Sequence, residues 1–439
     1  MTVQTEKPLL GPWMTSALVV GGMIGAGIFM LPVSLAPYGA NAIIAWVISS
    51  LGALSLAYSL ARLARRDGLG IQAYIERELG PTIGFVVTWA FWVSAWASNA
   101  ALAIAAAAGL ARIVPSLAGP SSIAWVAISL IAFLAIINAM GARTTGRLAI
   151  LTVAIKILPL LAVILIMGGK RVAGSPFEPL AALPLNFDNI AAATALTLFA
   201  LLGFETATAP VDKVRNPGRT IPLAIMAGTA FVAILYLFSS TAVLLILPAG
   251  AVAASVAPFA DAVGSAWGEQ AALLAAFGMV VSAFGALNGG VMIAGELSYS
   301  MASRGDLPAL FAKTTRSGTP VLSQMIAAGI AIILVMLNMG RDTAGLFTFV
   351  ILLTTSATLW LYLAGAVAAL KQRPSPGVAS VVIVGIAFTA FAFYGVGREA
   401  NLWGLTLLAA GLAIRTGMRA LNSRAPILAA APAPAAPRE

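Results

Sequence analysis

The 439-residue sequence contains no cysteine and no histidine. Without cysteine the chain has no disulfides and no thiolate nucleophile, and cysteine usage says nothing of its redox compartment. The absence of histidine removes the side chain that most often shuttles protons near neutral pH and binds metals. A zinc-type site and a Ser–His catalytic pair are therefore excluded, and we expect no metal, no cofactor and no catalytic residues.

Charged residues are also scarce. They make up only 9% of the chain, against about 25% in a soluble domain, while 60% of the residues are hydrophobic. The mean hydropathy is +0.98. This composition predicts an all-α protein that crosses a membrane many times. We expect no secretory signal, because the first apolar run follows a short polar arm and is read as part of the first span.

Apolar runs long enough to span a bilayer occur twelve times. The predicted spans cover residues 12–36, 41–62, 82–111, 121–139, 147–168, 189–211, 220–247, 269–302, 321–339, 343–369, 377–396 and 400–420. If the first span starts in the cytoplasm, most of the 25 lysines and arginines fall on the cytoplasmic side. This asymmetry favours an inner (plasma) membrane protein with both termini in the cytoplasm. It also accounts for the net charge of +10 through contact with the lipid bilayer, without nucleic acid as a partner.

We divide the chain into four parts on this basis. A cytoplasmic arm, 1–10, precedes a core, 11–370, and two more spans, 371–421, lead into a tail, 422–439. The tail is rich in alanine and proline, which predicts disorder.

The first span contains four glycines within seven residues, at positions 21, 22, 25 and 27. Each glycine in a helix interior costs about 1 kcal/mol relative to alanine. A helix interrupted at this depth exposes backbone groups, and this is tolerated where they line a cavity. The alternative is that Gly21 and Gly25 only let two helices approach closely.

The sixth span has a second interruption, where Gly203 and Glu205 break an apolar run. A carboxylate deep in a span is by default a candidate functional group. It could also cap the second half of a broken helix.

Lys156 is a third anomaly, since it lies about ten residues from either end of the fifth span. It needs an acceptor, which a carboxylate or the carbonyls of an unwound first span would supply. It is either a proton carrier or a fixed charge that pins two helices together. Polar residues in the third and eighth spans are weaker candidates that could instead form interhelical hydrogen bonds; they are Ser98, Asn99, Ser282 and Asn288.

The two interruptions lie five spans apart. This spacing predicts two repeats of opposite orientation, about 11–168 and 189–370, with a substrate bound at the membrane midplane between the broken helices.

Three motifs carry a resemblance to a known superfamily. GGMIGAGIFMLP, LLGFETATAPVDKVRNPGRTIPLAI and MASRGDLPALFAKTTRSGTPV occur in this order. The chain through about residue 370 resembles the amino acid–polyamine–organocation (APC) permeases, and among them the bacterial arginine/agmatine antiporter branch. The resemblance implies a LeuT-like 5+5 inverted repeat with helices 1 and 6 broken, and a possible homodimer.

The resemblance also implies roles for individual residues. The first break would present backbone to the substrate at Gly21, Gly22, Met23, Ile24, Gly25, Ala26 and Gly27. The second break, around Leu202 and Gly203, would follow an aromatic gate at Phe199. Glu205 corresponds to a gating or proton-sensing glutamate, Asn99 to an asparagine of the third span, and Lys156 to a lysine that replaces a sodium ion.

Three departures bear on the substrate. Gly22 and Ala26 stand where the antiporter branch has Asn and Ser, and Val291 replaces a Trp. The lost tryptophan removes a cation–π partner for a guanidinium group. A wider, more apolar site for neutral amino acids is therefore expected.

The sequence thus predicts a sodium-independent amino acid transporter that works by alternating access, through exchange or proton coupling. The alternative is an arginine/agmatine-type or other cationic amino acid or polyamine antiporter, and a channel is a remote one. An intramembrane enzyme is not expected, because all six aspartates fall in predicted loops or at span ends.

Overall fold

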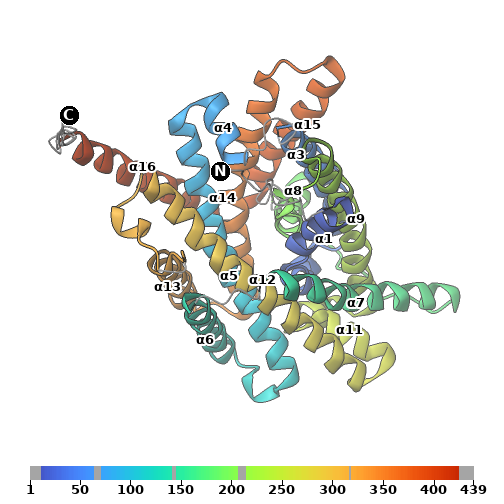
Figure 1. Ribbon diagram of the computed structural model, residues 1–439. Coiled ribbons are helices and arrows are strands. Elements are labelled where there is room, and N and C mark those ends of the chain that lie inside the picture. Colours follow the sequence, from blue (N-terminus) through green and yellow to red (C-terminus); the bar gives the residue numbers. More distant parts are fainter. Residues whose placement is uncertain (1–10, 64–70, 141–144, 206–213, 316–317, 425–439) are drawn as a thin grey trace, which may run out of the picture.

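The computed structural model describes residues 11–63, 71–140, 145–205, 214–315 and 318–424. Across these ranges the regular elements are all helices, and they form one bundle (Figure 1). Their bounds, in chain order, are α1 Pro12–Met23, α2 Gly27–Leu35, η1 Ala36–Tyr38, α3 Ala40–Leu63, α4 Ile71–Leu79, α5 Pro81–Ile113, η2 Pro115–Leu117, α6 Pro120–Ala139, α7 Thr145–Val172, α8 Phe187–Ala200, α9 Pro217–Ile246, α10 Ala249–Ala254, α11 Pro258–Trp267, α12 Glu269–Ser303, η5 Ala309–Ala312, α13 Val321–Leu337, α14 Thr343–Lys371, α15 Pro376–Val396 and α16 Arg398–Arg424.

Each of the twelve predicted spans coincides with a helix or with a pair of helices. Seven helices are individually long and apolar enough to cross a membrane, namely α3, α5, α6, α9, α12, α14 and α15, and α1 with α2 forms an eighth span. The other four predicted spans correspond to α7, α8, α13 and α16, of which α8 and α13 are apolar but shorter. Proline at the first helical position starts α5, α6, α9 and α15, where its missing N–H costs nothing. The chain is a multi-pass membrane protein.

Both predicted interruptions are present. α1 ends at Met23, α2 starts at Gly27, and the two helices meet at a bend of 44°. α8 ends at Ala200 and is followed by a turn in which Gly203 has a φ of +109°. The rest of this predicted span, 206–211, lies outside the described residues.

The two predicted sets of five spans have corresponding contacts. α1, in span 1, packs on α9, in span 7. The corresponding helices of the other set, α8 in span 6 and α3 in span 2, also pack on each other. The contact of α7 with α12 and that of α5 with α14 form a second such couple. The exact limits of the two repeats, 11–168 and 189–370, stay a prediction.

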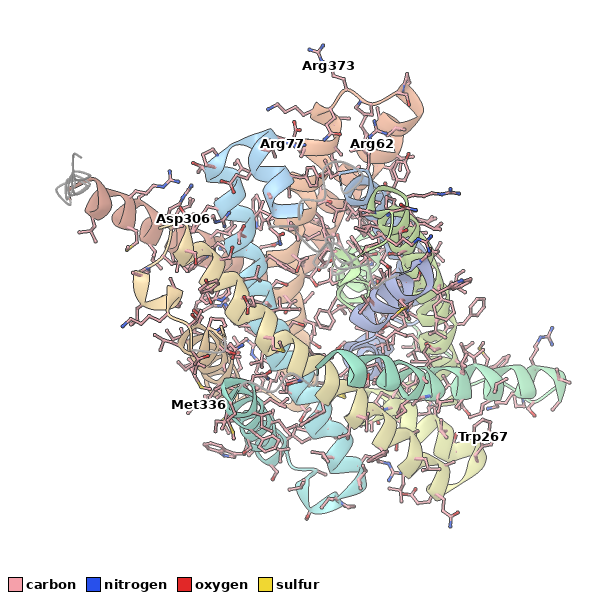
Figure 2. The ribbon with its side chains drawn as sticks, in the orientation of Figure 1. Arg62, Arg77, Trp267, Asp306, Met336 and Arg373 are labelled. Atoms are coloured by element: carbon pink, nitrogen blue, oxygen red, sulfur yellow. The ribbon has the colours of Figure 1, made fainter. Side chains whose placement is uncertain are left out.

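The two ends of the bundle differ in character. Arg62, Arg77 and Arg373 lie toward the end that carries α4, whereas Trp267 and Met336 lie toward the opposite end (Figure 2). We call these the α4 end and the α11 end. At the α4 end, Tyr74 and Ile75 of α4 are fully buried.

A buried ion pair fixes the last helix at the α4 end. Arg415 of α16 is 3% exposed, and its Nε donates to Asp306 Oδ1 at 2.8 Å. Its Nη2 donates to the Pro81 carbonyl at 2.7 Å, and the guanidinium stacks over Phe85 at 4.9 Å. α16 is thereby held against the start of α5 and the loop after α12. It extends to Arg424, beyond the predicted start of the tail at residue 422, and the rest of the tail lies outside the described residues.

Candidate functional site

A cavity of about 720 Å³ lies at the two helix breaks. Residues of α1, α2, α5, α7, α8, α12 and α14 line it, together with the backbone of both breaks. Thirteen residues singled out from the sequence line this wall: Gly21, Gly22, Met23, Gly25, Gly27, Ser98, Asn99, Lys156, Phe199, Leu202, Gly203, Glu205 and Asn288. Seven helices and the two breaks, which lie far apart in the sequence, thus converge on one space.

Three expected site residues do not line the cavity. Ile24, Ala26 and Val291 are at most 1% exposed, and they pack into the surrounding core. Around position 291 of α12, the residues that line the cavity are Gly289, Gly290 and Ile293, so the helical repeat turns Val291 away. We expected valine at position 291 to widen the site. Val291 does not line the cavity, so it is not the residue that sets the width of the site.

The unwound segment is held by donors from three other helices. Lys156 Nζ of α7 donates to the Gly21 carbonyl at 3.4 Å, as the sequence suggested for this buried ammonium. The hydroxyl of Tyr236, on α9, donates to the Met23 carbonyl at 3.0 Å. Ser282 Oγ of α12 donates to the Gly25 carbonyl at 3.2 Å. The carbonyls of Gly21, Met23 and Gly25 thus each accept a hydrogen bond from a side chain of another helix.

The first amides of α2 present the opposite chemistry. The N–H groups at the start of a helix have no partner within that helix. Within the described chain, no hydrogen bond forms from the amides of Ala26, Gly27 or Ile28. These donors stand at the positive end of the α2 dipole, which favours an anionic group.

The second break centres on Glu205, which is 8% exposed. Its Oε2 accepts from the Gly203 amide at 3.2 Å and from the hydroxyl of Tyr362, on α14, at 2.9 Å. The Phe204 ring stacks on Tyr362 with centroids 4.9 Å apart. A Cβ at Gly203 would lie 2.9 Å from the Gly22 carbonyl oxygen, so the two breaks are in contact through their glycines.

Phe199, near the end of α8, lines the cavity. Its ring meets Phe347 edge-on with centroids 6.3 Å apart, and a Cβ at Gly27 would lie 2.4 Å from the ring. Only glycine at position 27 leaves room for this ring. The role of Phe199 as an aromatic gate stays a prediction.

Asn99 and Asn288 contribute in different ways. Asn99 is 1% exposed, its side-chain amide finds no hydrogen-bond partner among the described residues, and it lies against Gly290. Asn288 Oδ1 accepts from Asn138 Nδ2 at 2.8 Å. Asn288 therefore forms the interhelical hydrogen bond considered as its alternative role, in addition to lining the cavity.

Sequence reasoning missed the apolar part of the wall, which includes Leu102, Val280, Phe284 and Ile293. Nothing in the sequence distinguishes these from other apolar residues of long helices. It also missed Tyr236 and Tyr362, although both tyrosines interrupt apolar runs and could have been noticed as buried hydroxyls that need partners.

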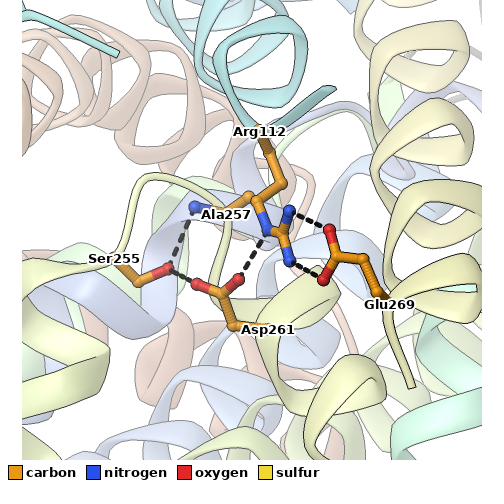
Figure 3. A network of polar contacts seen from close by, with 5 residues as sticks. All are labelled: Arg112, Ser255, Ala257, Asp261 and Glu269. Atoms are coloured by element: carbon orange, nitrogen blue, oxygen red, sulfur yellow. Dashed lines mark hydrogen bonds and ion pairs between the residues drawn. The ribbon is translucent and has the colours of Figure 1, made fainter. Parts of the chain in front are cut away.

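The α11 end carries a network of polar contacts (Figure 3). Arg112 of α5 donates to both carboxylate oxygens of Glu269 at 2.7 and 2.8 Å, and to Asp261 of α11 at 2.8 Å. Ser255 donates to the other oxygen of Asp261. Beneath this network, Phe259 of α11 meets Phe29 of α2 edge-on with centroids 5.4 Å apart.

A cavity between two broken helices, within a multi-pass bundle, defines a membrane transporter rather than an enzyme. Residues 10–412 match the amino acid permease family, and the chain belongs to this family.

Curated relatives support the same assignment. The chain is 28% identical over 418 residues to the putrescine transporter PotE of Haemophilus influenzae, covering 92% of this chain and 95% of the relative. It is 28% identical over 415 residues to PotE of Escherichia coli, covering 91% and 94%. The cadaverine/lysine antiporter of Escherichia coli is 28% identical over 329 residues, covering 73% and 72%.

Proposed function

We propose that the protein exchanges monocarboxylic amino acids with neutral, apolar side chains across the inner membrane. The observation that carries this proposal is the charge of the cavity wall. Its described residues include one ammonium, on Lys156, and one carboxylate, on Glu205. A wall of one positive and one negative group, with apolar side chains around them, suits a zwitterion better than a cation.

The geometry suggests how such a substrate would be oriented. Its carboxylate would accept hydrogen bonds from the first amides of α2, at Gly27 and Ile28. Its amino group would lie near backbone carbonyls of the two breaks. Its side chain would extend toward Leu102 and Phe284, where the wall is apolar.

Lys156 supports sodium independence in this proposal. Its ammonium donates a hydrogen bond to the Gly21 carbonyl. Without it, a bound cation such as sodium would be needed to balance the exposed carbonyls of the break. Coupling would then proceed by exchange of substrates, or through protons carried by Lys156 or Glu205.

The membrane placement is part of the proposal. The arginines of the α4 end would face the cytoplasm, with both chain termini on that side. A homodimer remains an expectation from the family resemblance.

The relatives favour a second candidate, an antiporter of polyamines or cationic amino acids. Two of them carry putrescine in their names and one carries cadaverine and lysine. A diamine brings two positive charges, and Lys156 would oppose one of them at close range. This opposition is why the neutral amino acid is preferred.

The test uses purified protein in liposomes loaded with a mixed amino acid pool. Uptake of labelled leucine, arginine and putrescine is measured without sodium at two values of pH. Leucine uptake that needs an internal substrate supports the proposal. Saturable counterflow would separate this transporter from a channel. Arginine or putrescine uptake without leucine uptake would establish the second candidate instead.

Lys156 gives a separate check on coupling. In Lys156→Ala the Gly21 carbonyl loses its donor, so uptake is expected to fall by at least about tenfold. Uptake that requires sodium in the wild type and survives this substitution would overturn the proposed role of Lys156.

A further inference from the structure

We infer that Gly289 of α12 sets the size of the substrate side chain that the cavity accepts. This inference rests on the proposed function, because it concerns the substrate of the same site. It assigns to one position the limit between small and large neutral amino acids. Gly289 is a specificity-determining residue, since the side chain that it lacks leaves room for part of the substrate.

Several glycines at the cavity have a packing reason to be glycine. At four of them a Cβ would lie no further than 3.2 Å from another protein atom, and these are Gly25, Gly27, Gly203 and Gly290. At Gly290, for example, that atom belongs to the side-chain amide of Asn99. Alanine at any of these positions would displace a neighbour. The close packing of the bundle therefore accounts for the missing side chain at each of the four.

Gly289 differs from these four glycines. A Cβ at this position would meet no atom of the described residues within 4 Å. Gly289 lies in the interior of α12, where glycine lowers the stability of a helix relative to alanine. Because no neighbouring side chain needs the space, packing gives no reason for this loss of stability. The reason lies in the cavity itself.

The helical repeat directs position 289 into the cavity. Residues spaced by four along a helix share one face. Val281, Gly285, Gly289 and Ile293 have this spacing on α12, and all of them line the cavity. Val281 and Ile293 carry apolar side chains on this face, whereas positions 285 and 289 carry none. The face therefore has a recess between Val281 and Ile293, and its surroundings are apolar.

The recess lies on the α4 side of the first break. A Cβ at Gly25 would lie 3.8 Å from Ala286 Cβ, so Ala286 is level with the break. From there α12 continues to the α4 end, where Arg304 donates to Glu76 of α4 at 2.9 Å. Gly289 follows Ala286 by three residues, or about 4.5 Å along the helix. A substrate bound at the first break, as proposed above, can thus extend its side chain along α12 into the recess.

The experiment compares Gly289→Ala and Gly289→Leu with Gly329→Ala. Gly329 is the matched control, because it lies in the interior of α13 and does not line the cavity, and a Cβ there also meets no atom of the described residues within 4 Å. Uptake of labelled alanine and leucine is measured in proteoliposomes loaded with a mixed amino acid pool. The midpoint of thermal unfolding in detergent is measured for each variant.

The larger substrate is expected to be affected most. In Gly289→Ala the half-saturating concentration of leucine should rise about tenfold or more, as for one extra carbon in an apolar pocket, whereas that of alanine should stay within about twofold. Gly289→Leu should abolish leucine uptake and retain alanine uptake. Gly329→Ala should leave the ratio of the two substrates unchanged. Both alanine substitutions should raise the unfolding midpoint, because both replace a helical glycine.

A single cysteine gives a second test of the same position. The chain has no cysteine of its own, so Gly289→Cys reacts with a thiol reagent at one position only. Leucine should slow this reaction more than alanine does, because its side chain fills the recess. Equal slowing by the two amino acids would overturn the inference, even if Gly289→Ala and Gly289→Leu fail to fold.

The outcomes separate the inference from the proposed function. A wild type that takes up putrescine and no amino acid overturns both. Leucine uptake in the wild type, with the same ratio of leucine to alanine in Gly289→Ala and in Gly329→Ala, overturns the inference alone. A ratio that falls only in the variants of Gly289 supports it.

Discussion

The two helices that meet at the first break differ in how they are packed. All nine residues of α2 are buried, whereas only three of the twelve residues of α1 are. Trp13 of α1 is 90% exposed, and Gly22, at the break itself, is exposed as well. We therefore expect the cavity to be closed toward the α11 end and to open on the side of α1. With the orientation proposed above, this would be an inward-facing arrangement.

The difference has a physical basis in the neighbours of each half. α2 packs against α8, α9, α10 and α11, and Phe29 of α2 meets Phe259 of α11 edge-on. Among the described residues, α1 packs mainly on α9 and touches α7, and only three of its residues are buried. A helix with few contacts can change its tilt at little cost in packing energy. We expect α1 to move first when the cavity changes its accessible side.

The largest expected effect comes from removing the cover of the closed half. Phe259→Ala deletes a fully buried ring, which typically costs about 3–5 kcal/mol of stability. The midpoint of thermal unfolding in detergent should fall clearly. Because the chain has no cysteine, a single Leu102→Cys reporter in the cavity can be added, and it should react faster with a membrane-impermeant thiol reagent from the α11 end. Unchanged labelling would mean that Phe259 does not seal this side.

A smaller effect is expected at the junction of the two halves. Lys156→Met removes the ammonium from the Gly21 carbonyl and is expected to cost about 1.5–3 kcal/mol, the usual range for a hydrogen bond to a charged group. Labelling of a Trp13→Cys reporter should change in this background, because α1 loses a link to α7. Val163→Ala, a buried position further along α7, is the control for general loosening of that helix.

A still smaller change is expected from Arg112→Gln. The side chains of this network are partly exposed, so solvent screens the interaction. Labelling of Leu102→Cys from the α11 end should rise by about twofold to fivefold, and high salt should produce part of this rise in the unsubstituted protein. Arg171→Gln, an exposed arginine at the end of α7, should leave labelling unchanged. An equal rise in both variants would assign the effect to net charge instead of the network.

The smallest effect is expected in the open half. Trp13→Ala removes a side chain that is 90% exposed, so stability should change by less than about 0.5 kcal/mol. Its unfolding midpoint is compared directly with that of Phe259→Ala. Similar losses in the two variants would contradict the contrast between α1 and α2.

Much of the fold was predictable because it depends on local composition. Apolar runs of about 20 residues gave the helices, and glycines 21–27 together with Gly203 gave both breaks, since each signal lies within a few neighbouring residues. The acceptor of Lys156 was also foreseen, because a buried ammonium must find oxygen atoms. Such inferences need no knowledge of how distant helices pack.

The parts that could not be predicted depend on helix rotation. Val291 and Gly290 are adjacent in sequence, yet only Gly290 lines the cavity. The partner of Glu205 is Tyr362, 157 residues away, and that of Met23 is Tyr236, 213 residues away. Which faces of the helices meet is decided by packing over the whole bundle, which a single sequence does not display.

The ion pair of α16 has a consequence for biosynthesis. Asp306 follows α12, whereas Arg415 comes 109 residues later in the chain. While α13, α14 and α15 are made and inserted, Asp306 has yet to meet this partner and must stay in contact with water or lipid headgroups. Synthesis of α16 then supplies the guanidinium that allows the loop to bury its charge. The order of translation thus makes closure of the α4 end one of the last steps of assembly.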